Sequence, residues 1–307
     1  MQVTRRTALT VLVLGLSGCA ASPVVSGTPA LAPSSPPPTQ APEDAAAQAA
    51  VARLESVLNG LATLVDPGEQ AWSAAALQQC AAHLELLQLP DPFGPEGQEP
   101  FVVETPDSAF DSAEAGDLAF AEQLSRTVDS LESAAASSDA GDLRLLYASA
   151  ATGAAALGNR SVPPAAGAVP VRLQPTTVEA SLPIALGHAW ALIHGLGVGL
   201  GRLASKDPLH AVGTARLPIA KGLRNDLRAA IVGEVPEQPA AFELPNAMSS
   251  PDEIRAAWAS LETNLLDGYA RLVAASDEAA WRLAMRAQVE PVQAVGGALG
   301  FWPGWVE

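Results

Sequence analysis

The stretch from Leu182 to Leu203 constrains the fold of this chain more than any other. Apolar side chains recur in it at alternating steps of four and three residues, which places them along one side of a helix of about six turns. They are Leu182, Leu186, Ala189, Ile193, Leu196, Leu200 and Leu203. No charged residue occurs between positions 180 and 201, so the other faces are also apolar and the helix has to be enclosed on several sides. A central helix of a helical bundle meets this requirement, and so does a membrane-spanning helix.

The N-terminus has the pattern of a processing signal. Two arginines precede an apolar run over residues 8–16, which is too short to span a bilayer. The residues Leu-Ser-Gly-Cys at 16–19 follow and resemble the lipobox of bacterial lipoproteins, in which the cysteine becomes the acylated N-terminus. The paired arginines also resemble a weak twin-arginine export signal. The resemblance implies a signal peptide at 1–18, a lipidated Cys19, and an exported protein anchored to the outer face of the cell membrane. An ordinary signal peptide with a chance cysteine is the alternative.

Composition limits the partners of the rest of the chain. Residues 19–42 are mainly Ser, Pro, Ala and Thr, which predicts a disordered tether between the lipid and the folded body. Alanine, leucine and valine dominate the whole chain and aromatic residues make up 5%, a mixture that favours closely packed helices. The net charge of −16 argues against binding to nucleic acid, which needs clustered Lys and Arg. It also argues against electrostatic docking on anionic lipid, so membrane lipid is expected to be contacted through the acylated cysteine.

Apolar residues at helical spacing predict an all-α fold with two helical bundles. Four helices are expected in an N-terminal domain at 43–157 and four in a C-terminal domain at 176–307, joined by a proline-rich linker at 158–175. The last helix is predicted from a series that runs from Trp281 to Leu299. Cys80 is in step with leucines of the second helix and is predicted to be a buried small hydrophobic residue.

Helix starts are signalled by capping residues in the C-terminal domain. Thr176 with Glu179 has the spacing of a capping box, and so has Ser250 with its following glutamate. Asp207 and the pair Ser276-Asp277 are predicted N-caps of the other two helices. Four helices with mostly short connections favour an antiparallel four-helix bundle.

Short motifs in this domain point to a family. They are Gly187-His188-Ala189-Trp190-Ala191, Arg224-Asn225-Asp226-Leu227, Leu261-Glu262 through Tyr269, and Pro303-Gly304. Together they resemble a family of actinobacterial ferritin-like domains found in envelope or lipoprotein-type proteins. The resemblance covers about residues 176–305 and implies a ferritin-like antiparallel four-helix bundle.

The metal ligands of that family are largely missing from this sequence. Ferritin-like carboxylate sites use glutamates from two helices and a Glu-x-x-His motif from each of the others, and no Glu-x-x-His occurs here. The family usually has Glu before the histidine of the first helix, where this chain has Gly187, and His on the second helix, where the register gives Lys221. We therefore expect no cofactor. A di-iron or manganese site around Glu262, Glu290 and His188 remains the alternative.

A buried polar cluster is a second hypothesis for the same region. Glu262 lies beside the apolar series of its helix and would be costly to bury without a partner. Lys221 or Arg224 on the neighbouring helix is the expected source of positive charge, with Asp226 and His188 as further members of the cluster. An exposed glutamate at a helix edge is the alternative.

These observations favour a non-enzymatic function. We expect an envelope lipoprotein with a degenerate, metal-free ferritin-like domain that acts as a binding or scaffold module for a partner protein or an apolar ligand. No Gly-x-Ser-x-Gly, Cys-x-x-Cys or His-Glu-x-x-His motif occurs. A metal-binding ferritin-like oxidoreductase or metal store is one alternative. An integral membrane helix is another, because Gly195-x-x-x-Gly199 permits close helix packing in membranes.

Overall fold

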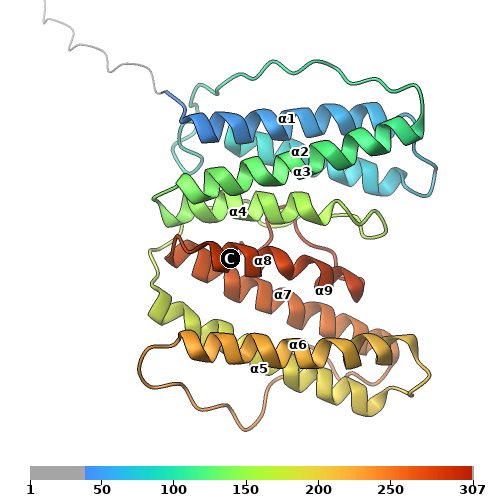
Figure 1. The fold of residues 1–307 in the computed structure, drawn as a ribbon, viewed down its shortest axis with the longest axis vertical. Coiled ribbons are helices and arrows are strands. Elements are labelled where there is room, and N and C mark those ends of the chain that lie inside the picture. The colour runs from blue at the N-terminus through green and yellow to red at the C-terminus, as the bar shows by residue number, and fades with distance from the viewer. Residues whose placement is uncertain (1–38, 306–307) are drawn as a thin grey trace, which may run out of the picture. The chain divides into compact units, whose positions relative to one another are not determined.

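The computed structural model describes residues 39–305 (Figure 1). The predicted signal peptide, the lipobox with Cys19 and most of the tether lie outside the described residues. Helices dominate the described part, in which the only β-type pairing is an isolated bridge between Ala165 and Gly300. The predicted all-α class is therefore confirmed. The helices are α1 (Pro42–Ala62), α2 (Gln70–Leu87), α3 (Ala113–Ser137), α4 (Gly141–Ala156), α5 (Val178–Arg202), α6 (Pro208–Ala230), α7 (Pro251–Ala275), α8 (Ala279–Ala287) and α9 (Val289–Ala294).

The N-terminal half consists of α1 to α4. Helix α1 packs against α2 and α3, and α3 packs against α4. Cys80 is 1% exposed within this core, and burial raises the pKa of its thiol, as expected for a packing residue. Helix α3 begins at Ala113, because the Ser112 side chain caps it by accepting a hydrogen bond from the Ala115 amide.

Helix α5 is the core helix of the C-terminal half and contacts both α6 and α7. Its glycines allow close approach: a Cβ atom on Gly199 would lie 2.6 Å from the Trp258 ring, and one on Gly195 would collide with Leu261. The Trp258 indole donates a hydrogen bond to the Gly195 carbonyl at 3.0 Å. Among the described residues, α5 is also the one helix long and apolar enough to cross a membrane.

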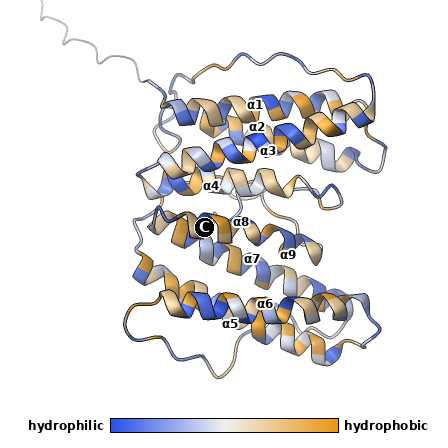
Figure 2. Ribbon diagram, in the orientation of Figure 1, coloured by the Kyte–Doolittle hydropathy of each residue, from blue (hydrophilic) through white to orange (hydrophobic). Residues whose placement is uncertain are grey.

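Helix α6 carries hydrophobic and hydrophilic residues side by side (Figure 2), as expected of a helix with one face in the core.

Two of the four predicted helix starts are correct and two are wrong. Ser250 and Asp207 cap α7 and α6 as predicted, accepting hydrogen bonds from the Glu253 and Leu209 amides. The prediction of Thr176 as a cap is wrong, because Thr177 accepts the bond from the Ala180 amide. Thr176 instead shares a hydrogen bond with the Ser181 hydroxyl. The prediction of Ser276-Asp277 as a cap is wrong, because α8 begins after Glu278, which makes no side-chain cap; Ser276 Oγ accepts a hydrogen bond from the Glu278 amide before the helix starts.

The predicted last helix is wrong in length. It is divided into α8 and α9 at Gln288, because Pro291 has no amide hydrogen to continue the helical bonding pattern across this point. Helix α9 ends before Gly296, which has a φ of 73° and turns the chain out of the helix. Leu299 is still buried, but in the non-helical C-terminal segment.

That C-terminal segment joins the two halves. The Ser149 hydroxyl of α4 donates to the Pro303 carbonyl at 2.7 Å, and His83 Nε2 of α2 lies 2.7 Å from the Phe301 carbonyl oxygen. Helix α4 also contacts α7, α8 and α9 directly. The predicted linker at 158–175 lies in a non-helical segment, yet the two halves pack against each other.

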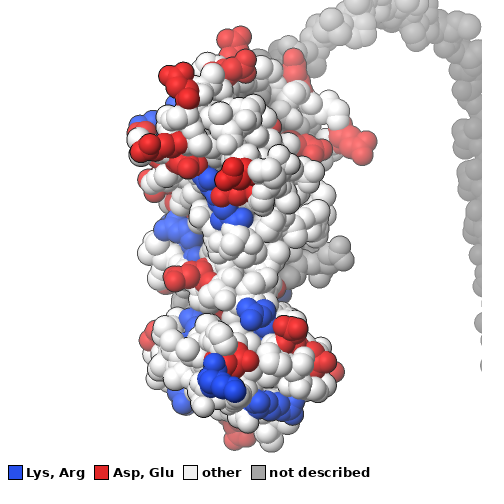
Figure 3. Space-filling model, turned by 90° about the vertical axis from the view of Figure 1, so that its right-hand side faces the viewer, with Lys and Arg blue, Asp and Glu red and all other residues white. Residues whose placement is uncertain are grey.

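Charge is unevenly spread over the face shown in Figure 3. Acidic side chains predominate over its upper part, whereas acidic and basic side chains lie close together on its lower part. This face therefore offers no continuous basic surface of the kind that nucleic acid requires.

Candidate ligand-binding site

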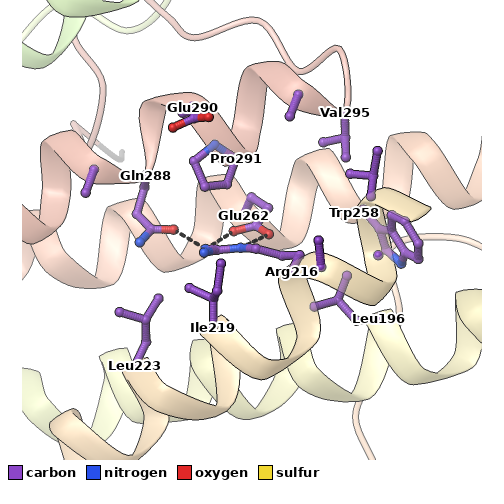
Figure 4. Close-up of a pocket in the computed structure, with 15 residues that line it drawn as sticks. Leu196, Arg216, Ile219, Leu223, Trp258, Glu262, Gln288, Glu290, Pro291 and Val295 are labelled. Carbon is purple, nitrogen blue, oxygen red and sulfur yellow. Dashed lines mark hydrogen bonds and ion pairs between the residues drawn. The ribbon is translucent and has the colours of Figure 1, made fainter. Parts of the chain in front are cut away.

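A cavity of about 410 Å³ lies among the helices of the C-terminal half (Figure 4). Helices α5, α6, α7, α8 and α9 and the residues between the last two contribute to its wall. The wall is mostly apolar and includes Leu196, Val212, Ile219, Leu223, Trp258, Pro291 and Val295. Its size and lining are typical of sites that bind small molecules.

The floor of the cavity is a buried polar cluster of Arg216, Glu262 and Gln288, here called the polar floor. Glu262 of α7 is 2% exposed, and both of its oxygens accept hydrogen bonds from Arg216 of α6: Nε to Oε1 at 2.8 Å and Nη2 to Oε2 at 2.8 Å. Nη2 also donates to Gln288 Oε1 at 2.7 Å. This two-point pairing fits the planar guanidinium to the carboxylate and compensates the cost of burying the charge.

Two donors of the polar floor remain free for a ligand. Gln288 is 2% exposed and lines the cavity, yet its Nε2 donates to no other described residue. Arg216 Nη1 likewise takes part in none of the bonds that this side chain makes with described residues. Neither nitrogen is among the fully buried side-chain atoms that lack a partner in the described part of the chain, so both are open to solvent. The polar floor therefore presents hydrogen-bond donors to whatever enters the cavity.

Glu290 lies in the cavity wall beside Pro291, on the side away from Arg216 (Figure 4). It is exposed and forms no ion pair with another described residue. The charged groups of the lining are thus one guanidinium and two carboxylates. This gives the cavity a net negative charge at neutral pH.

The positive partner of Glu262 is not the one that the sequence analysis expected. Lys221 is exposed, and Arg224 donates to Asn225 Oδ1 at 3.1 and 2.8 Å instead. Arg216 takes this role because it lies on the inward face of α6, between the buried Gly213 and Ala220 at steps of three and four residues. Lys221 is rotated by well over a quarter turn from that face.

Tyr269 and Asp226 lie outside the polar floor and do not line the cavity. Burial raises the pKa of Tyr269 to about 12; Arg216 opposes this rise and Asp226 adds to it. Asp226 itself is exposed on α6. Tyr269 therefore stays neutral and contributes to the packing of the core.

His188 is not brought to Glu262. Its ring lies against Gly268 of α7, where an added Cβ atom would be 3.1 Å from His188 Cδ2. Gly268 is six residues beyond Glu262, or about 9 Å along the helix. Burial and the nearby Arg271 lower the pKa of His188, which favours the neutral imidazole.

The residues present do not fit the carboxylate metal centre that the family resemblance implies. No group of three or more His, Cys, Asp or Glu side chains in the described part of the chain is placed to hold a metal ion. Both oxygens of Glu262 are taken by Arg216, and Glu290 is the other carboxylate in the cavity wall.

Comparisons with protein-family models, with curated proteins and with solved structures found no match to this chain. The function therefore has to be argued from the chemistry of the cavity. The residues that line it include no Ser, Thr, Cys, His or Lys, so this wall supplies no nucleophile paired with a base. What the arrangement can do is enclose an apolar molecule and offer it hydrogen-bond donors at one end.

Proposed function

We propose that this protein is an exported envelope lipoprotein, anchored through an acylated Cys19, whose C-terminal helices bind a small apolar ligand without catalysing a reaction. The observation that carries the binding function is the cavity of about 410 Å³ between α5 and α9, with apolar walls and a charge-compensated floor. Its lining favours binding over chemistry, because it combines many aliphatic groups with few polar ones.

The helices α5 to α9 are proposed to form a degenerate ferritin-like bundle. Support comes from the position of Glu262, which faces the space between helices where such bundles hold their metal ligands. Arg216 supplies at this carboxylate the positive charge that metal ions supply in ferritin-like sites. The exchange of metal for guanidinium would convert a redox centre into a binding cavity.

Filling the cavity tests the binding function. Ala215 and Ala229 are both exposed alanines of α6, but only Ala215 lines the cavity, and Ala229 lies about 21 Å farther along the helix. We expect the unmodified protein and Ala229→Trp to bind the neutral fluorophore Nile red saturably at one site per chain. Ala215→Trp should bind it about tenfold more weakly, because the indole occupies part of the cavity. Equal binding by the two variants would contradict the proposal.

A further inference from the structure

We infer that the ligand is an uncharged amphiphile that places a carbonyl or ether oxygen on the polar floor and its hydrocarbon chain along the apolar wall. This inference rests on the proposed function and specifies the ligand class of the same cavity. Three features of the described residues carry it: the free donors of the floor, the charge of the lining, and the exposed apolar residue in the wall.

The free donors call for an acceptor. Gln288 Nε2 and Arg216 Nη1 lie in a side-chain cluster whose acceptors are already engaged, since Glu262 accepts two bonds and Gln288 Oε1 accepts one. A ligand oxygen with lone pairs supplies the missing partner. A pure hydrocarbon would instead leave these donors without any partner once water is displaced, which costs affinity.

The charge of the lining excludes a charged end group at the floor. A carboxylate placed there would meet the guanidinium of Arg216, but that charge is already compensated by Glu262 at 2.8 Å, and Glu290 adds a second negative charge in the wall. An ammonium group would approach the guanidinium and would lack the acceptor chemistry that the free donors need. At the floor, both ions would lose their hydration without a full counter-charge, because Glu262 is already paired and Glu290 lies on the side away from Arg216, whereas a neutral carbonyl loses less.

The apolar wall determines how the hydrocarbon chain of the ligand is oriented relative to the polar floor. Ile219 lines the cavity and yet is 54% exposed, so apolar surface continues from the cavity to the outside of α6. Leu223 lies beside it on the same helix (Figure 4). A hydrocarbon chain covers this surface when its polar end is at the floor. Esters of fatty acids have this layout.

Competition between four probes of similar chain length tests the inference on the full chain. Methyl octanoate and octanoate have the same seven-carbon alkyl chain on a carbonyl carbon, octylammonium and octane have eight alkyl carbons, and the four differ chiefly in the end group. We expect methyl octanoate to displace Nile red at a concentration about tenfold lower than octane, octanoate or octylammonium, a ratio that corresponds to one or two buried hydrogen bonds or to the cost of burying an ion.

Two variants assign the preference to the named side chains. Gln288→Met removes the free amide donor at similar volume and should bring the ratio of ester to octane affinity close to one. Glu290→Gln removes the negative charge from the wall and should narrow the difference between octanoate and methyl octanoate. Thermal melting of both variants shows whether they fold. If Gln288→Met does not fold, the ranking of the four probes on the unmodified chain decides alone.

The outcomes separate this inference from the proposed function. Octanoate binding as tightly as the ester, or octane binding as tightly as the ester, would overturn the inference and leave an apolar cavity in place. Failure of all four probes to displace the dye from a site that is sensitive to Ala215→Trp would also overturn the inference. Equal binding of Nile red by Ala215→Trp and Ala229→Trp would instead overturn the proposed function.

Discussion

Removal of the guanidinium from the polar floor should destabilise the protein strongly. Arg216 and Glu262 are 11% and 2% exposed at their side chains and are joined by two hydrogen bonds of 2.8 Å. In Arg216→Met the aliphatic volume is retained, but the carboxylate of Glu262 stays buried without a counter-charge. Breaking a buried pair from one side costs about 3–5 kcal/mol, so we expect a loss of that size in the free energy of unfolding at pH 7.

Urea unfolding followed by circular dichroism measures this loss. Arg224→Met is the matched control, because Arg224 lies on the same helix and bonds only to its neighbour Asn225 among the described residues. The control should change stability by less than about 0.5 kcal/mol. A double variant with methionine at both 216 and 262 should recover to within about 1 kcal/mol of the unmodified protein, because no buried charge remains. A cost below about 1 kcal/mol for Arg216→Met would refute the reasoning.

Three further predictions concern the anchor, the absence of a metal cofactor and the C-terminal contact. Cys19→Ala should abolish incorporation of labelled palmitate and release the protein from the membrane fraction; unchanged labelling would contradict the lipobox assignment. Elemental analysis of protein from iron- and manganese-supplemented cells should find no stoichiometric metal, and metal that disappears in Glu262→Gln would support the oxidoreductase alternative. Burial lowers the pKa of His83 from 6.5 to about 4, so the folded state binds its proton less readily than the unfolded state. Its contribution is present above pH 6.5 and about 3 kcal/mol is lost as the pH falls to 4. Urea unfolding across this range should show a smaller fall in stability for His83→Gln, and an identical pH dependence would contradict this.

The helical core was largely predictable from residue spacing. The seven-residue series of α5, from Leu182 to Leu203, describes a helix that the structure packs against α6 and α7. The close approach at Gly195 and Gly199 also follows from the sequence, since only glycine leaves room for the side chains of Leu261 and Trp258. The helix and its close contacts depend on the spacing of residues within one segment, so the sequence of that segment is enough to predict them.

The ends of helices were less predictable because neighbouring residues compete for the same role. Thr176 and Thr177 both have the side chain of an N-cap, and the choice depends on the tertiary bond of Thr176 to Ser181. The apolar series from Trp281 to Leu299 continues through a helix break, because the buried face is kept by α8, α9 and the extended segment in turn. The spacing of the apolar residues therefore predicts which of them are buried, but it does not predict where the backbone stops being helical.

The centre of the candidate site was only half visible in the sequence. Glu262 stood out as a carboxylate in an apolar helix, but its partner Arg216 was passed over in favour of Lys221 and Arg224. The position of Arg216, in step with the buried Gly213 and Ala220, was the available signal. Gln288 was not predicted to be part of the site. Its part in the polar floor depends on the break between α8 and α9, which places its side chain against Arg216.

The central claim is that the cavity above Arg216 and Glu262 binds a neutral apolar molecule. Methyl-resolved NMR of the protein, titrated with methyl octanoate, tests it most directly because Leu196, Ile219, Leu223 and Val295 all line this cavity. The account predicts saturable shifts of the methyl signals of these four residues at one ligand per chain, with little change at methyl groups of α1 to α4. Shifts confined to other residues, or none that saturate, would contradict it.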